Sequence, residues 1–173
     1  MGMYPGGNIV RVTPTLSTDA YAQNDVLFNP TEIKNAVSHR GGVSRLIAAY
    51  LLDQSDVADS DIAFMFSEGN TDIGTINATA DITDANAEGI NFTGMMKCDA
   101  DQGSTGSALD GFRLHQIIPT AASVGGESAS TSQLLQAAEG STSVYISAVL
   151  QSSTTPTYAA DDLDIILHIE YLG

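Results

Sequence analysis

The stretch Leu163-Asp-Ile-Ile-Leu-His-Ile-Glu-Tyr171 has the strongest β-strand pattern of the chain. Successive side chains of a strand point to opposite faces, so alternating apolar and polar residues predict a half-buried strand. We expect one face to belong to the core, and it carries Leu163, Ile165, Leu167, Ile169 and Tyr171. The opposite face carries Asp164, Ile166, His168 and Glu170. Ile166 stands among polar residues, so this face is either an ordinary solvated sheet face or a surface partly covered by a second subunit.

Similar patterns predict strands along most of the chain. The run 43–52 is apolar on both faces, which favours a central strand buried on both sides; a helix is the alternative, since Leu, Ala and Arg favour helices. Asn29-Pro30 is expected to form a turn, and 133–138 either a strand or one helical turn. Further strands are predicted at residues 9–13, 25–28, 32–37 (an edge strand), 62–66, 90–97, 112–118 and 143–150.

One short helix is predicted at residues 82–88, with Thr83 or Asp84 as its N-cap. About eight strands at short spacing, with so little helix, indicate an all-β fold. We therefore expect an antiparallel β-sandwich or jelly-roll-like single domain with at most one or two short helices. Residues 1–8 are rich in glycine and are expected to be a flexible N-terminal arm, and residues 9–173 are expected to form the β-sandwich domain.

The chain is strongly acidic, with 21 Asp and Glu against 6 Lys and Arg among 173 residues, and a formal net charge of -15. This charge repels nucleic acid and anionic membranes, so neither is expected as a partner. The alternative explanation is that the negative charge serves only to keep the protein soluble. The single cysteine, Cys98, excludes an intrachain disulfide, which predicts a reducing compartment and stability that comes from packing or assembly.

The residue types of catalytic and metal sites do not occur in the spacings that such sites require. His39, His115 and His168 lack the close pairing of zinc ligands. The stretch 99–110 departs from a calcium loop where an oxygen ligand and a glycine are required, and no Gly-x-Ser-x-Gly elbow is present. We therefore expect no enzyme activity, no cofactor, and no catalytic or metal-binding residues. The residues expected to contact partners are Met1, Tyr4, Pro5, Ile166 and His168.

Several short segments resemble a known class of protein. Val12-Thr-Pro-Thr-Leu16, Asp19-Ala-Tyr-Ala22 and Asp25-Val-Leu-Phe28 resemble the opening of small virion-associated proteins of tailed bacteriophages, particularly those of aquatic hosts. The resemblance continues through Gly41-Gly42 and the strand after it, Leu52-Asp-Gln54, Ile82-Thr-Asp-Ala-Asn-Ala87, Ser143-Val-Tyr-Ile-Ser-Ala-Val149 and Pro156-Thr-Tyr158. It covers most of the chain in outline, and the matching segments are structural in character.

The resemblance implies a non-enzymatic virion part, with a capsid decoration (cement) protein as the leading expectation. Such proteins are often small β-rich trimers on the outside of the head shell. The implied partners are the major capsid protein and further copies of the chain, with a homotrimer favoured. The implied location is the capsid exterior, after synthesis in the host cytoplasm. The alternatives are a tail- or fibre-associated virion protein that binds host-surface glycan, and a hydrolase built on a jelly roll.

Overall fold

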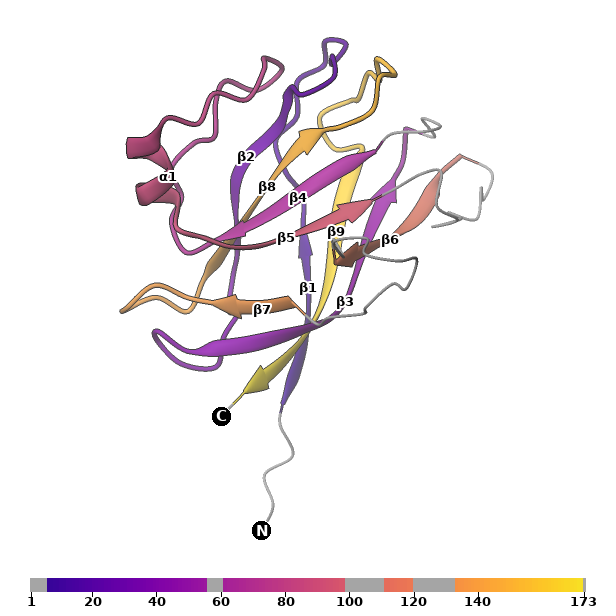
Figure 1. Cartoon of the computed structure of the whole chain (residues 1–173). Coiled ribbons are helices and arrows are strands. Elements are labelled where there is room, and N and C mark those ends of the chain that lie inside the picture. The colour runs from indigo at the N-terminus through magenta and orange to yellow at the C-terminus, as the bar shows by residue number, and fades with distance from the viewer. Residues whose placement is uncertain (1–5, 56–60, 99–110, 120–132, 173) are drawn as a thin grey trace, which may run out of the picture.

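The computed structural model describes residues 6–55, 61–98, 111–119 and 133–172 (Figure 1). Within these residues the regular structure consists of β-strands and one short helix, α1 (Asp84–Ile90). The predicted all-β class is therefore confirmed. The strands are β1 (Gly7–Val12), β2 (Val26–Ile33), β3 (Val43–Asp53), β4 (Ile62–Ser67), β5 (Phe92–Cys98), β6 (Arg113–Pro119), β7 (Gln133–Gln136), β8 (Val144–Leu150) and β9 (Leu163–Leu172).

The strands form one curled antiparallel sheet. Its order is β1-β9-β3-β6-β5-β4-β8-β2, and β7 pairs beside β3 outside this path. We call β1, β9, β3 and β6 the first half-sheet, and β5, β4, β8 and β2 the second half-sheet. The sheet curls so far that β1 and β2, at the two ends of the order, contact each other. The two half-sheets therefore face each other as the layers of a sandwich (Figure 1).

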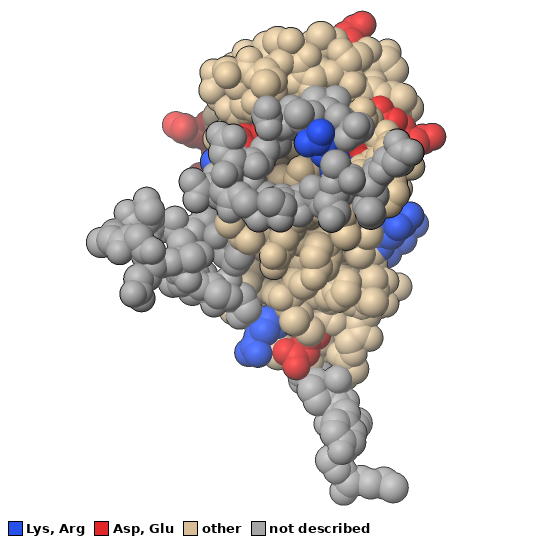
Figure 2. Space-filling model, turned by 90° about the vertical axis from the view of Figure 1, so that its right-hand side faces the viewer, with Lys and Arg blue, Asp and Glu red and all other residues tan. Residues whose placement is uncertain are grey.

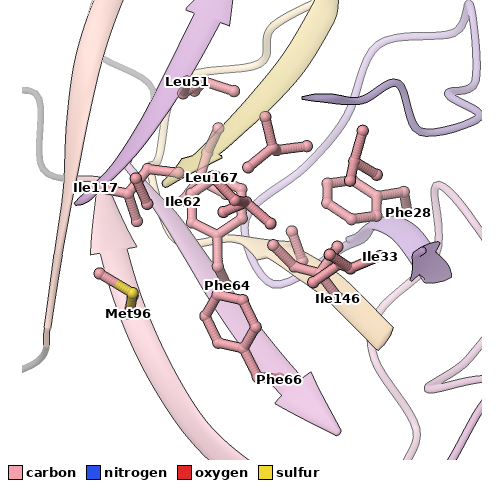
Figure 3. Close-up of a cluster of buried hydrophobic side chains, with 14 of the residues drawn as sticks. Phe28, Ile33, Leu51, Ile62, Phe64, Phe66, Met96, Ile117, Ile146 and Leu167 are labelled. Carbon is pink, nitrogen blue, oxygen red and sulfur yellow. The ribbon is translucent and has the colours of Figure 1, made fainter. Parts of the chain in front are cut away.

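The core lies between the two half-sheets (Figure 3). Leu51 and Leu167 come from the first half-sheet, and Phe64 and Ile146 from the second; all four are almost fully buried. Phe28 packs beside Phe64 with ring centroids 6.4 Å apart in a tilted arrangement. Burying each such side chain contributes about 1.5–3 kcal/mol relative to exposure.

The strand pattern that opened the sequence analysis corresponds to β9. Leu163, Ile165, Leu167 and Ile169 are buried in the core as predicted, and Tyr171 is half-buried. β9 lies between β1 and β3 and pairs with both of them over most of its length. It is therefore a central strand of the first half-sheet, with one face in the core and the other on the outside.

The run at 43–52 is a central strand, β3, and the helix alternative is excluded. The expectation of burial on both sides was wrong. The pairing of β3 with β9 shifts between Leu46 and Ala48, which is the signature of a β-bulge. Ile47 is the extra residue, and its side chain is 62% exposed. The bulge puts Leu46 and Ala49 on the same buried face, although strict alternation had separated them.

The turn expected at Asn29-Pro30 is absent, because both residues lie inside β2. β2 is an end strand of the sheet, where proline is tolerated because its missing N–H does not interrupt a ladder between two neighbours. The register of β2 against β8 also shifts twice in this region. β2 ends at Ile33 and Asn35 turns the chain at φ 53°, so the predicted edge strand at 32–37 is correct only for its first two residues.

The remaining predictions have mixed outcomes. The side chain of Thr83, one of the two predicted N-caps, caps α1 by accepting a hydrogen bond from the backbone N–H of Asn86. Residue 133 begins a strand rather than a helical turn. β1 begins at Gly7, so residues 7 and 8 belong to a strand and not to the predicted arm. No helix among the described residues is long and apolar enough to cross a membrane.

Candidate interaction face

The outer faces of the two half-sheets differ in how they are covered. On the second half-sheet, Val26 and Val149 are buried in a small cluster with Ile73 and Ile90, which belong to the connection between β4 and β5. That connection, including α1, therefore covers part of this outer face with the chain's own residues (Figure 1). On the outer face of the first half-sheet and of β7, four large hydrophobic side chains remain exposed: Ile9, Ile47, Leu114 and Leu134.

Opposite residues on antiparallel strands point to the same face, so the register assigns the side chains of this outer face directly. His168 of β9 stands between Ile9 of β1 and Ala48 of β3. The next rung holds Ile166 between Arg11 and Tyr50. At the end nearer the N-terminus, Glu170 stands between Gly7 and Arg45, and at the other end Asp164 lies opposite Leu52. We call the outer surface of β1, β9 and β3 the interaction face.

The charged residues of the interaction face are paired. Arg11 Nη1 lies 3.3 Å from Asp164 Oδ2, and Thr13 Oγ1 also donates a hydrogen bond to this carboxylate. At the opposite end, Arg45 Nη1 lies 3.4 Å from Glu170 Oε2. Two arginines balance two carboxylates, so the face has no net charge in a chain of net charge -15. Figure 2 shows the right-hand side of Figure 1, where red and blue side chains stand in small groups on a surface of mostly uncharged described residues.

The middle of the interaction face is apolar and slightly hollow. Ile9 and Ile47 stand on either side of His168, and these three residues line a shallow hollow of about 190 Å³. The ring of Tyr50 packs edge-on against the imidazole of His168, with centroids 5.6 Å apart and an interplanar angle of 65°. This contact restrains both side chains. An apolar centre between charged ends is the usual anatomy of a protein–protein interface.

The structure brings two of the five predicted contact residues together. Ile166 and His168 both lie on the interaction face and are partly buried within it. Met1, Tyr4 and Pro5 lie outside the described residues. Arg11 and Ile9, which the predictions omitted, share this face. Arg11 stands between the partly buried Val10 and the buried Val12 in β1, a pattern that marks the outer face of that strand.

A second exposed apolar cluster lies on the outer face of β4 and β5. Met65, Ile82, Phe92 and Met95 line a shallow hollow of about 470 Å³. Met65 and Met95 are directly paired across the two strands. This cluster lies beside the connection that covers the second half-sheet, and it is separate from the interaction face in the order of the strands.

A buried carboxyl group lies at the end of β3, on the core side. Asp53 is 2% exposed, and its Oδ1 accepts hydrogen bonds from the backbone N–H, at 2.8 Å, and the hydroxyl of Ser55. Burial raises the pKa of Asp53 above its ordinary 3.8; the bonds from Ser55 and the charge of His115 lower it, and the charge of Asp162 raises it further. Among the described residues no three His, Cys, Asp or Glu side chains gather as metal ligands.

The two strand histidines do not meet. His115 lies on β6 and is buried opposite Leu51, so it points to the core side. His168 lies on β9 and points outward, and β3 separates the two strands. A site that combines them is therefore excluded by the topology.

Comparison with known proteins found no matching family model, curated protein or solved structure.

Proposed function

We propose that this chain is a non-enzymatic structural protein of a tailed-bacteriophage virion, and specifically a capsid decoration protein on the outside of the head. The observation that carries the proposal is the interaction face: a sheet surface with an apolar centre and internally paired charges. A surface of this kind serves binding to another protein. The resemblance of the sequence segments to virion proteins supplies the biological setting.

The connectivity of the strands supports a jelly roll, the finer part of the predicted fold. Leaving out the short β7, the first and last strands pair (β1 with β9), as do the second and second-last (β2 with β8). The third strand pairs with the third-last (β3 with β6), and the two middle strands pair with each other (β4 with β5). A long antiparallel hairpin that is rolled up produces these four pairs, and this is how a jelly roll is connected. Jelly rolls are common in viral capsid proteins.

The charge of the chain supports a position on the outside of the particle. A net charge of -15 repels packaged DNA, so a position against the genome is disfavoured. The alternative of a glycan-binding tail or fibre part is less well supported. Sugar recognition usually uses exposed aromatic rings, and among the exposed large hydrophobic residues that the structure describes only Phe92 is aromatic.

Gold labelling of intact virions tests the proposal. A short epitope tag is added at the C-terminus in the phage that encodes the chain, and the particles are imaged by electron microscopy. Label distributed over the head is the expected result. Label confined to the tail, or absent from purified particles, would contradict the assignment as a decoration protein. A particle with a tagged major capsid protein is the matched positive control.

The arm is tested separately by deleting residues 1–5, which stops before β1 begins at Gly7. We expect the shortened chain to fold with unchanged stability, because no described core residue is removed. Occupancy on the head is expected to fall, since Met1, Tyr4 and Pro5 are among the residues predicted to contact partners. Full occupancy of the shortened chain would show that the head is bound through other parts of the chain.

A further inference from the structure

We infer that the interaction face binds the same face of a second copy of this chain, which makes a dimer in place of the homotrimer that the resemblance implied. The inference deepens the proposed function by naming the partner at this surface, and it rests on that function only for its biological setting. The residues at its centre are Ile9, Ile47 and His168, from the three strands that form the face. The two arginine–carboxylate pairs mark its two ends.

The net charge of the chain indicates which partner binds the interaction face. Two copies of a chain with net charge -15 repel each other over most of their surfaces, so they associate only where that repulsion is lowest. The interaction face is such a place, because Arg11 and Arg45 balance Asp164 and Glu170 within it. A basic partner selected by charge would instead bind the acidic parts of the surface. Neutrality of this one face therefore favours a partner that is itself acidic.

Shape supports the same occupant. Ile9 and Ile47 protrude, with exposed fractions of 65% and 62%, and the hollow over His168 lies between them. The face thus presents two protruding isoleucines at the same level of the sheet, one on each strand beside β9. When two such faces meet about a two-fold axis that runs along β9, β1 of each copy lies over β3 of the other. The isoleucine of each strand then meets the isoleucine of the opposite strand, which satisfies the reciprocity of an isologous contact.

The size of the face fits a modest dimer. β9 has 10 residues, and the interaction face has three strands, β1, β9 and β3. At about 3.3 Å per residue and about 4.8 Å per strand, this gives a planar footprint of about 480 Å². A standard stable interface buries about 800 Å² per partner, so we expect a dissociation constant in the micromolar range rather than an obligate dimer.

Sedimentation equilibrium of the full chain between about 1 and 200 µM tests the inference, because this range brackets the affinity expected for an interface of this size. The wild-type chain is expected to be a monomer–dimer mixture. Ile47→Glu is expected to weaken the dimer at least about 100-fold, because it places a charge in the centre of the face in both copies. Ile9→Glu tests the other strand in the same way and keeps the experiment informative if one variant does not fold.

Met95→Glu is the matched control. Met95 is an exposed apolar strand residue at 46%, but it lies in the second cluster, so the dimer is expected to persist. Equal loss of the dimer in Met95→Glu would overturn the inference. A wild-type chain that stays monomeric throughout would also overturn it, and so would a trimer, because a closed trimer uses two different surfaces of each copy.

Ionic strength gives an independent readout. Added salt screens the repulsion between two acidic chains, so the dimer is expected to tighten between about 50 and 500 mM salt. A dimer that weakens with salt would point to attraction between opposite charges and would overturn the argument. The two proposals fail separately: a monomer found on phage heads contradicts only the pairing, and a dimer absent from virions contradicts only the function in the virion.

Discussion

Asn29 provides the sharpest test of how the structure is held together. The sequence predicted a turn at this position, but Asn29 lies within β2 and its amide reaches the connection between β4 and β5. Its Oδ1 accepts a hydrogen bond from the backbone N–H of Ile73 at 3.0 Å, and its Nδ2 donates one to the carbonyl of Gly74 at 2.8 Å. One side chain thus provides the hydrogen-bond partners of two backbone groups, as the backbone of a neighbouring strand would.

Asn29→Ala leaves both backbone groups without this partner. Ile73 is fully buried, so its N–H loses access to any replacement, whereas Gly74 is partly exposed and its carbonyl can bind water. An unsatisfied buried group costs about 1–3 kcal/mol. With a smaller contribution from the carbonyl, we expect a loss of about 2–4 kcal/mol in the free energy of unfolding. In a chain of this size this lowers Tm by about 5–15 °C.

Urea denaturation followed by circular dichroism measures this loss, with Gln116→Ala as the control. Gln116 is an exposed amide on β6, so its removal is expected to change stability by less than about 0.5 kcal/mol. Asn29→Asp keeps the acceptor for Ile73 but places a second acceptor against the carbonyl of Gly74, so it is expected to be destabilising as well. If Asn29→Ala is as stable as Gln116→Ala, the side chain does not anchor the connection and the reasoning is refuted.

Three further changes have defined outcomes. The raised pKa of Asp53 means that its carboxyl favours the folded state below the ordinary 3.8, and this contribution is lost as pH rises through the raised pKa. Asp53→Asn is therefore expected to gain stability relative to wild type between about pH 3 and 7; a constant difference in urea midpoint would contradict this. Gly69→Ala is expected to cost more than about 2 kcal/mol, because the new Cβ would collide with the carbonyl oxygen of Gly89; an unchanged midpoint would disprove that close approach. Leu167→Ala is expected to cost about 2–5 kcal/mol, and a loss below about 1 kcal/mol would show that β9 is not central to the core.

The interaction face was partly visible in the sequence. Ile166 stood out as an apolar residue among polar neighbours, and His168 was placed on the same side by alternation. Arg45 and Arg11 could not be added to the face, because their partners Glu170 and Asp164 are more than a hundred positions away in the chain. Only the pairing of β9 with both β1 and β3 brings these residues together.

Ile47 shows why the remaining part of the face was missed. Alternation within 43–52 gave apolar residues on both sides and predicted burial on both sides. The bulge at Ile47 depends on how β3 pairs with β9. The sequence of β3 alone does not determine its register against β9. The turn predicted at Asn29 was wrong for a related reason. The side chain of Asn29 hydrogen-bonds to the backbone of Ile73 and Gly74, which belong to a distant segment.

Local patterns in the chain were sufficient for the all-β class, for most of the strands and for the buried side of β9, because strand formation and amphipathic burial depend on neighbours along the chain. Long-range pairing decided the rest: the curl of the sheet, the side on which the β4–β5 connection lies, and the outer face left uncovered. Coverage of a sheet face is a relation between segments far apart in sequence. A run of residues therefore predicts that a face is half-apolar, but the assembled fold determines whether the chain or a partner covers it.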